Sequence, residues 1–76
     1  MSKLKKISCE ELIKILSNKF GFRLLRQKGS RIILKKEILN GSIGTVVPKH
    51  NELKLGTLKG ILKQEDIDEN EFIEYQ

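Results

Sequence analysis

The sequence contains one histidine, His50, two residues after the proline that ends the last predicted strand. Histidine is the side chain that most often accepts or donates a proton in catalysis near neutral pH. Lys49 and Arg31 are among the cations expected near it, and such groups stabilise the charge that develops on a phosphorane. RNA supplies its own nucleophile, the 2′-hydroxyl, so a base and cations suffice in principle to cleave it. The alternative is that His50 is a turn residue hydrogen-bonded to backbone, and spacing alone favours that alternative.

Other kinds of catalytic or ligand site find little support. With one histidine and one cysteine, Cys9, no Ser-His-Asp or Cys-His arrangement can be argued. Cys9 falls on an apolar stripe, which favours a small buried hydrophobe over a reactive thiol. Glu65, Asp66 and Asp68 carry oxygens suited to magnesium, but a solvated helix end is the simpler interpretation. Gly29-Ser30 is too short to cradle a phosphate by itself. We therefore expect neither a metal nor a cofactor.

Charge divides the chain into two parts. All 15 lysines and arginines lie in residues 1–64, which hold four acids and so carry +11. Residues 65–76 hold six acids and no base, which makes −6. A compact body of +11 indicates a polyanionic partner, most simply a nucleic acid. The alternative is that the lysines only keep a small domain soluble.

Length and composition limit the fold and the setting. Seventy-six residues predict a single domain, 1–76, with an acidic tail at 65–76, and exclude a barrel or dinucleotide-binding enzyme. A lone cysteine cannot form an intrachain disulfide, and a small secreted domain would normally need such cross-links. We therefore expect a cytoplasmic protein. No apolar run is longer than three residues, so we expect no membrane span.

The local pattern predicts two helices and a short third one. Ser8 to Glu11 forms a capping box, and apolar residues at three- and four-residue spacing follow, so residues 9–20 should be a helix that ends before Gly21. A second helix should open near Gly56-Thr57, with Thr57 or the residue before it as the cap. Asp68 to Glu71 repeats the capping chemistry, so a short final turn should dock Phe72 and Ile73 on the body.

Between the helices the pattern predicts three strands. Residues 22–27 alternate, with Phe22, Leu24 and the Arg26 stem on one face. A polar turn at 28–30 and a second strand at 31–36 follow, with Ile32 and Leu34 pointing inward. Asn40-Gly41 is a turn signal, and a third strand at 43–47 ends at Pro48. Connections this short require antiparallel neighbours.

These elements predict an α+β fold, a three-stranded antiparallel sheet with two helices on one face and a short C-terminal appendage. The other face of the sheet should meet water. The alternation places four side chains on that face, of which three are cationic: Arg23, Gln27, Arg31 and Lys35.

Two segments carry a resemblance to a known family. Phe20-Gly21-Phe22 followed by Arg26-Gln27-Lys28-Gly29-Ser30 resembles the "GF…RQKGSH" segment of HicA toxins, the YcfA-like family. Val47-Pro48-Lys49-His50, Leu53 and then Gly56 to Gln64 resemble that family's "VPxH…L…GTLxxILxQ" segment. The order and spacing agree, and the likeness runs from Leu12 to about Phe72.

The resemblance implies a small αβββα sandwich like the double-stranded-RNA-binding domain, which agrees with the predicted element order. It also implies ribosome-independent cleavage of mRNA by a stress-response toxin. Its partner would be a HicB-like antitoxin that binds the toxin and covers its active site. No small-molecule cofactor is implied.

One position departs from the family pattern. The family's catalytic histidine follows Gly-Ser at the start of the second strand, and Arg31 occupies that position here. Arginine keeps the positive charge but cannot accept a proton. The candidate catalytic residues are then His50, Arg31 and the adjacent Ser30. Residues expected to bind RNA are Lys28, Gly29, Arg31, Lys35, Lys49, Lys59 and Lys63.

Three functions follow from this departure. The chain is a nuclease, weakened or using His50 for proton transfer; or it binds RNA without chemistry; or binding an acidic antitoxin is its main role. Few aromatic residues are available for base stacking, so weak sequence selectivity is expected. The acidic tail either folds back across the cationic surface or is an ordinary solvated helix end.

Overall fold

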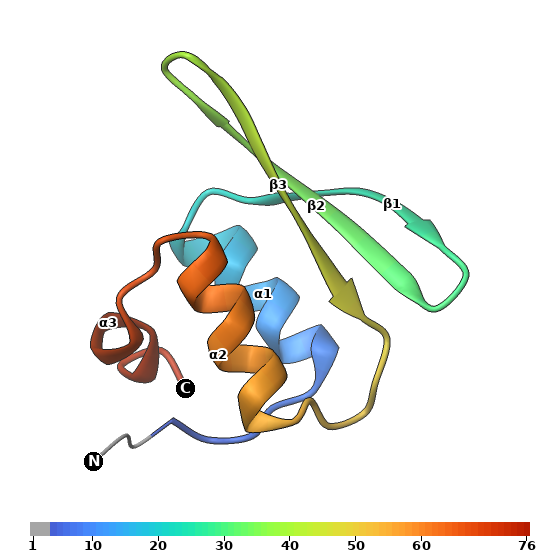
Figure 1. The fold of residues 1–76 in the computed structure, drawn as a ribbon, viewed down its shortest axis with the longest axis vertical. Coiled ribbons are helices and arrows are strands. Elements are labelled where there is room, and N and C mark those ends of the chain that lie inside the picture. The colour runs from blue at the N-terminus through green and yellow to red at the C-terminus, as the bar shows by residue number, and fades with distance from the viewer. Residues whose placement is uncertain (1–3) are drawn as a thin grey trace.

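The computed structural model describes residues 4–76, which form three helices and one three-stranded sheet (Figure 1). The sheet is antiparallel with strand order β1-β2-β3, as expected. In chain order the elements are α1 (Cys9–Lys19), β1 (Arg23–Lys28), β2 (Arg31–Ile38), β3 (Gly41–Pro48), α2 (Leu55–Gln64) and α3 (Glu69–Ile73).

Helix α1 begins at the residue that the sequence predicts and ends at Lys19, one residue earlier than expected. The Ser8 hydroxyl accepts a hydrogen bond from the Glu11 amide at 3.1 Å, which satisfies one of the free amides of the first turn. Gly21, just beyond the helix, has φ +78°, a conformation that glycine adopts without steric cost. The apolar stripe turns inward, since Leu12 and Leu16 are completely buried.

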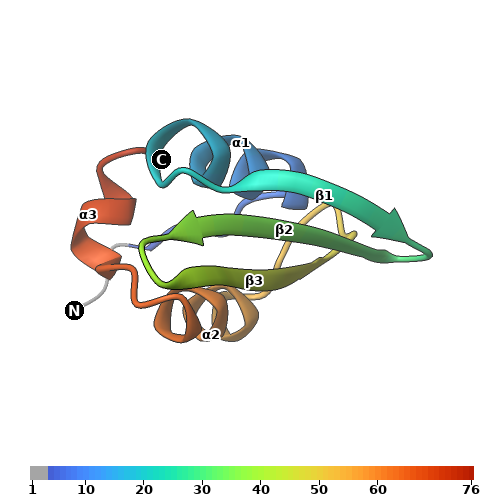
Figure 2. The same cartoon turned by 90° about the horizontal axis from the view of Figure 1, so that it is seen from above.

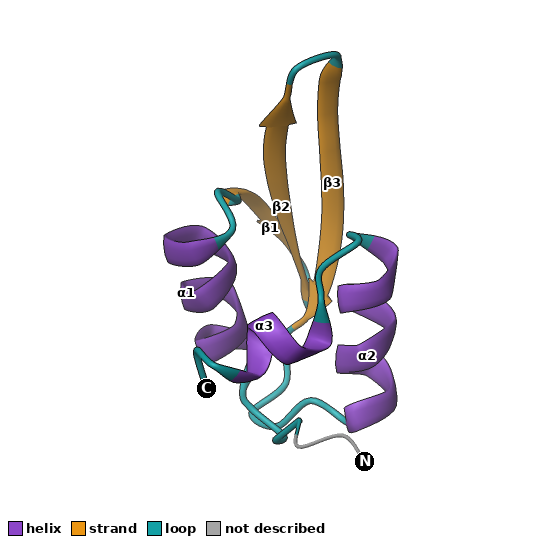
Figure 3. Ribbon diagram, turned by 90° about the vertical axis from the view of Figure 1, so that its left-hand side faces the viewer, coloured by secondary structure: helices purple, strands orange, loops and turns teal. Residues whose placement is uncertain are grey.

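The helices cover one face of the sheet and leave the other open. Figure 2 places α1 along the β1 side and α2 along the β3 side, and Figure 3 shows both on the same side of the strands. The core lies between these layers and combines side chains from every layer. Its completely buried members include Leu12, Leu16, Leu34, Val47, Leu53, Leu58 and Phe72.

Strand β1 contains a bulge that strict alternation does not anticipate. Leu24 lies opposite Leu34 and Arg26 lies opposite Ile33, so Leu25 is an extra residue without a direct partner. Side chains directly opposite each other share a face of the sheet. The bulge therefore reverses the predicted directions of the two residues that follow it.

Two expectations are corrected by this register. Arg26, expected to lay its stem inward, shares the open face with Ile33. Gln27, expected on the open face, lies opposite the buried Ile32 and so faces the helices. Leu24 was expected to point inward, and its pairing does place it on the helix side. It is nevertheless 58% exposed, because it lies on an edge strand that the helices cover only in part.

Several element boundaries also differ from expectation, and β1 spans Arg23–Lys28 instead of 22–27. Strands β2 and β3 pair from Arg31 opposite Pro48 to Ile38 opposite Gly41, so both are longer than expected, and Leu39 and Asn40 form the turn between them. Helix α2 begins at Leu55, with Lys54 as its N-cap and no side-chain cap, so neither Thr57 nor Gly56 caps it. The β1–β2 turn likewise has two residues, Gly29 and Ser30. With φ +60° at its first residue, this turn suits a glycine.

The acidic tail folds into α3 and packs on the helices. Asp68 caps α3 by accepting from the Asn70 amide at 2.9 Å, and Phe72 is completely buried. The Phe72 ring stacks on Phe20 with centroids 6.2 Å apart. Figure 3 shows α3 between α1 and α2, on the side away from the sheet. The tail therefore does not cross the open sheet face.

Candidate nucleic-acid interface

The open face of the sheet carries a group of cations fixed by strand register. Arg23 lies opposite Lys35, and Lys28 lies opposite Arg31, so each pair shares this face. Arg26 joins them because of the bulge, and all but the half-buried Lys35 are exposed. We call this group the cationic sheet face: Arg23, Arg26, Lys28, Arg31 and Lys35.

The cationic sheet face is unfavourable for the folded protein alone. Like charges directly opposite each other on neighbouring strands destabilise a sheet, and two such pairs occur here. One of the five cations has an acidic partner: Arg23 donates to Glu37 across 2.8 Å, in an ion pair whose side chains are both about two-thirds exposed. Such exposed pairs contribute little to stability. An added polyanion would relieve the repulsion that remains.

The loop after β3 is held against the β1–β2 turn. The Lys49 amide donates to the Ser30 carbonyl at 2.7 Å, and Arg31 lies opposite Pro48. These contacts place Lys49 beside the turn at one end of the sheet. The turn, the start of β2 and the loop after β3 therefore form a single corner of the molecule.

His50 is anchored at this corner through its backbone. Its amide donates to the Pro48 carbonyl at 3.0 Å, and its carbonyl accepts from the Cys9 amide at 3.1 Å, which ties the loop to the first turn of α1. The residue is exposed. The backbone bonds that define the turn therefore leave the imidazole available to a bound molecule.

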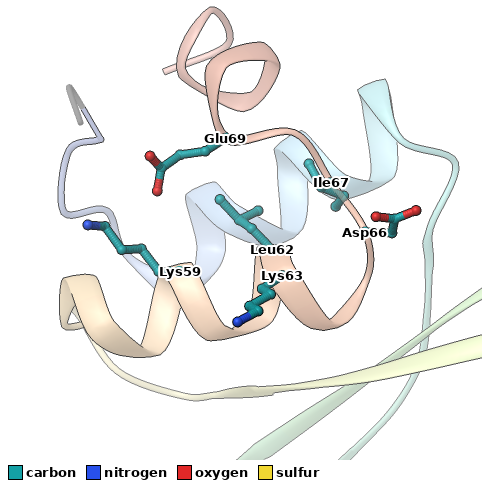
Figure 4. Close-up of a pocket in the computed structure, with 6 residues that line it drawn as sticks. All are labelled: Lys59, Leu62, Lys63, Asp66, Ile67 and Glu69. Carbon is teal, nitrogen blue, oxygen red and sulfur yellow. The ribbon is translucent and has the colours of Figure 1, made fainter. Parts of the chain in front are cut away.

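Most of the expected site residues come together at or near this corner, and two do not. Lys28, Gly29, Ser30, Arg31, Lys49 and His50 lie at the corner, and Lys35 lies farther along the same sheet face. Lys59 and Lys63 lie on α2 and line a cleft of about 390 Å³ between α2 and α3 (Figure 4). They share that cleft with acids, so its charge is mixed.

The floor of the α2–α3 cleft is apolar, formed by Leu62 and Ile67, and Asp66 and Glu69 line it together with the two lysines. This balance does not suit a polyanion. Within residues 4–76, no group of three or more histidine, cysteine or acidic side chains is placed to hold a metal ion.

Two features of the open face escaped sequence reasoning. Arg26 was missed because nothing in the letters of β1 marks the bulge. The face also has an apolar centre, since Ile33 lies opposite Val46, which is 47% exposed. The one sequence signal that Val46 points outward was the alternation of β3. Its neighbour Val47 points inward and is completely buried.

Beneath β3, a buried hydroxyl approaches an acidic side chain. Thr45 is 3% exposed and its hydroxyl meets no partner in ordinary hydrogen-bond geometry. Partial burial raises the pKa of the nearby Glu65 carboxyl, and proximity to the Thr45 hydroxyl offsets part of that rise. Both groups lie on the helix side of the sheet and take no part in the cationic sheet face.

Comparison with known proteins bears on these observations. A family model described as the HicA toxin of bacterial toxin-antitoxin matches residues 9–67, which include α1, the whole sheet and α2. No curated protein and no solved structure matches the chain. In the part of the chain that the structure describes, no helix has the length and apolar character to cross a lipid bilayer.

Proposed function

The chain belongs to the HicA toxin family of bacterial toxin–antitoxin systems, and on that premise we propose that it is an endoribonuclease that binds and cleaves mRNA. The corner formed by the β1–β2 turn, Arg31, Lys49 and His50 is the observation that supports this proposal most directly. Its cations lie on a face that nothing in the described chain covers, and its one titratable imidazole is exposed.

The proposed chemistry uses the RNA's own hydroxyl. Neutral His50 accepts the 2′-hydroxyl proton, and the resulting alkoxide attacks the adjacent phosphorus. The bond to the 5′-oxygen of the next nucleotide breaks, leaving a 2′,3′-cyclic phosphate, and that oxygen takes a proton from water or an imidazolium. Arg31, Lys28 and Lys49 stabilise the doubly charged phosphorane. Arg31 remains protonated throughout, so its role is electrostatic.

The wider sheet face would hold the strand. Arg26 and Lys35 lie along β1 and β2 at positions where they would contact successive phosphates, while Ile33 and Val46 give the face an apolar centre. Phosphate contacts carry no sequence information, so weak sequence selectivity follows. A HicB-like antitoxin would then act by covering this face.

Cleavage of a long purified mRNA by the full chain tests the proposal. We expect cut RNA with cyclic phosphate ends, undiminished by EDTA, and a loss of about 10²–10⁴-fold in rate for His50→Ala. Lys14→Ala, which removes an exposed cation in the middle of α1 and outside the corner, is the matched control and should cut normally. Intact RNA at a large excess of folded protein would contradict the proposal.

A second function is favoured by one observation, the presence of Arg31 where the family has its catalytic histidine. In this case the chain binds RNA through the cationic sheet face without cutting it. About five neutralised phosphates predict that a fourfold rise in salt weakens single-strand binding by about 10²-fold. Salt-dependent binding by both wild type and His50→Ala, with no cleavage by either, would identify this function.

A further inference from the structure

The two edges of the sheet are protected very differently. Strand β1, at one edge, carries three cations and a bulge, features that discourage pairing with another strand. Strand β3, at the other edge, spans eight residues (GSIGTVVP) without one charged side chain and pairs without a bulge along its whole length with β2. Its only built-in protection is Pro48, at its end.

The free side of β3 is available for backbone pairing. In the described chain β3 has β2 as its single neighbour, and residues 41–47 make no backbone hydrogen bond outside the sheet. Alternate amides and carbonyls of an edge strand point away from the sheet. Figure 2 shows β3 as the outermost strand on the α2 side, and Figure 1 shows the β2–β3 hairpin extending beyond the helices.

The side chains next to this edge indicate the charge of a matching strand. On the open face β3 presents Ser42, Gly44 and Val46, all small and uncharged. Lys35 lies opposite Gly44, so no side chain stands between Lys35 and a strand added beyond β3. Such a strand would lie two strand spacings from β2, about 10 Å, which the side chains of lysine and glutamate bridge together.

We propose that β3 is a docking edge for an extended segment of a partner protein. The acidic side chains of that segment lie on the same face as the cationic sheet face. The partner adds a fourth antiparallel strand, its backbone pairs with β3, and its acids approach Lys35 over Gly44. A second copy of this chain fits less well, because pairing β3 with β3 would place two cationic sheet faces side by side. The proposal does not rest on RNA cleavage.

A synthetic peptide, Thr-Glu-Val-Glu-Val-Glu-Thr, serves as the probe for the full-length isotope-labelled chain. We expect saturable binding that slows hydrogen exchange of amides in residues 42–47 and leaves β1 amides unchanged. Two versions of the peptide, N-methylated on alternate residues, each block the amides along one edge of the peptide strand. The version methylated on the edge that pairs with β3 should lose binding, and the version methylated on the outer edge should keep it. A lysine-for-glutamate version should bind at least tenfold more weakly.

A matched pair of protein variants tests the charge match. Lys35→Gln should weaken peptide binding about twofold to fivefold, the range for one exposed ion pair, and Lys14→Gln should not change it. Equal binding of the two N-methylated peptides, protection at β1, or no binding at millimolar peptide would overturn the proposal. So would a free protein that is already dimeric with β3 amides protected, since a second copy would then occupy the edge.

Discussion

The open sheet face gathers cations at alternate strand positions, whereas the opposite side of the molecule gathers acids around α3. The cations are held in place by register, with two like-charge pairs directly opposed. The acids lie at helix ends, where Glu69 and Glu71 occupy the first turn of α3 and favour its positive end. Charge therefore costs stability on one side and adds to it on the other, which agrees with the proposal that the first side binds a polyanion.

The two sides also differ in their relation to the family. The family model covers the sheet and both long helices and ends at residue 67, so the cationic sheet face lies within the matched region and α3 lies beyond it. The strands that carry the face therefore lie in the part of the chain that matches the family. Helix α3, beyond that part, closes the helical layer.

Restoring a proton acceptor on the cationic face should give the largest effect. We expect Arg31→His to raise the rate of RNA cleavage by about 10²–10⁴-fold, because a general base would then stand where the resemblance places the family's catalytic histidine. Arg31→Lys keeps the charge without a usable base and should show no gain. An Arg31→His rate equal to wild type would mean that a base at position 31 adds nothing to the proton transfer proposed for His50.

Removing the apolar anchor of the acidic side should greatly reduce stability. Phe72→Ala should lower the free energy of unfolding by about 3–5 kcal/mol, since the ring is completely buried and stacks on Phe20. Leu39→Ala, at the 98% exposed tip of the β2–β3 hairpin, should stay within about 0.5 kcal/mol of wild type. Urea denaturation measures both. A small loss for Phe72→Ala would mean that α3 is not part of the core.

Neutralising cations on each side should separate RNA-binding lysines and arginines from the others. Arg26→Gln with Arg31→Gln should reduce the slope of log affinity against log salt by about 1.4, the value for two single-strand phosphate contacts. Lys59→Gln with Lys63→Gln, in the mixed-charge α2–α3 cleft, should reduce it less. Fluorescence anisotropy with a labelled oligonucleotide measures the salt slope of both double variants. An equal reduction of the slope in the two would mean that the cationic sheet face binds RNA no more than the α2–α3 cleft does.

The smallest effect concerns Glu65 and pH. Burial raises its pKa in the folded state, so between the usual glutamate pKa and the raised value the folded state binds more protons than the unfolded state. Stability should therefore fall slightly as pH rises through that window. Glu65→Gln should remove this part of the fall in melting temperature, whereas Glu74→Gln, on an exposed residue, should not. Identical pH profiles for the two variants would contradict the assignment.

The sequence predicted well those elements whose ends are marked by side chains. The Ser8 and Asp68 caps form hydrogen bonds, and both helices that they open were expected. Helix α2 was expected too, but its start was misplaced because its N-cap, Lys54, forms no side-chain cap hydrogen bond. The positions of Arg23, Arg31 and Lys35 on the open face were predicted correctly, since strict alternation holds in β2 and before the bulge in β1. The predicted directions of Arg26 and Gln27 were wrong, because both residues follow the bulge.

The extra residue in β1 has a consequence for how such chains diverge. Deleting Leu25 would bring β1 back to strict alternation and leave Arg26 opposite Ile33, so Arg26 and Lys28 would keep their places on the open face. A relative with a strand one residue shorter could thus carry the same five charges on its cationic sheet face. A sequence alignment that opens no gap at Leu25 would assign the charges after it to the wrong side of the protein.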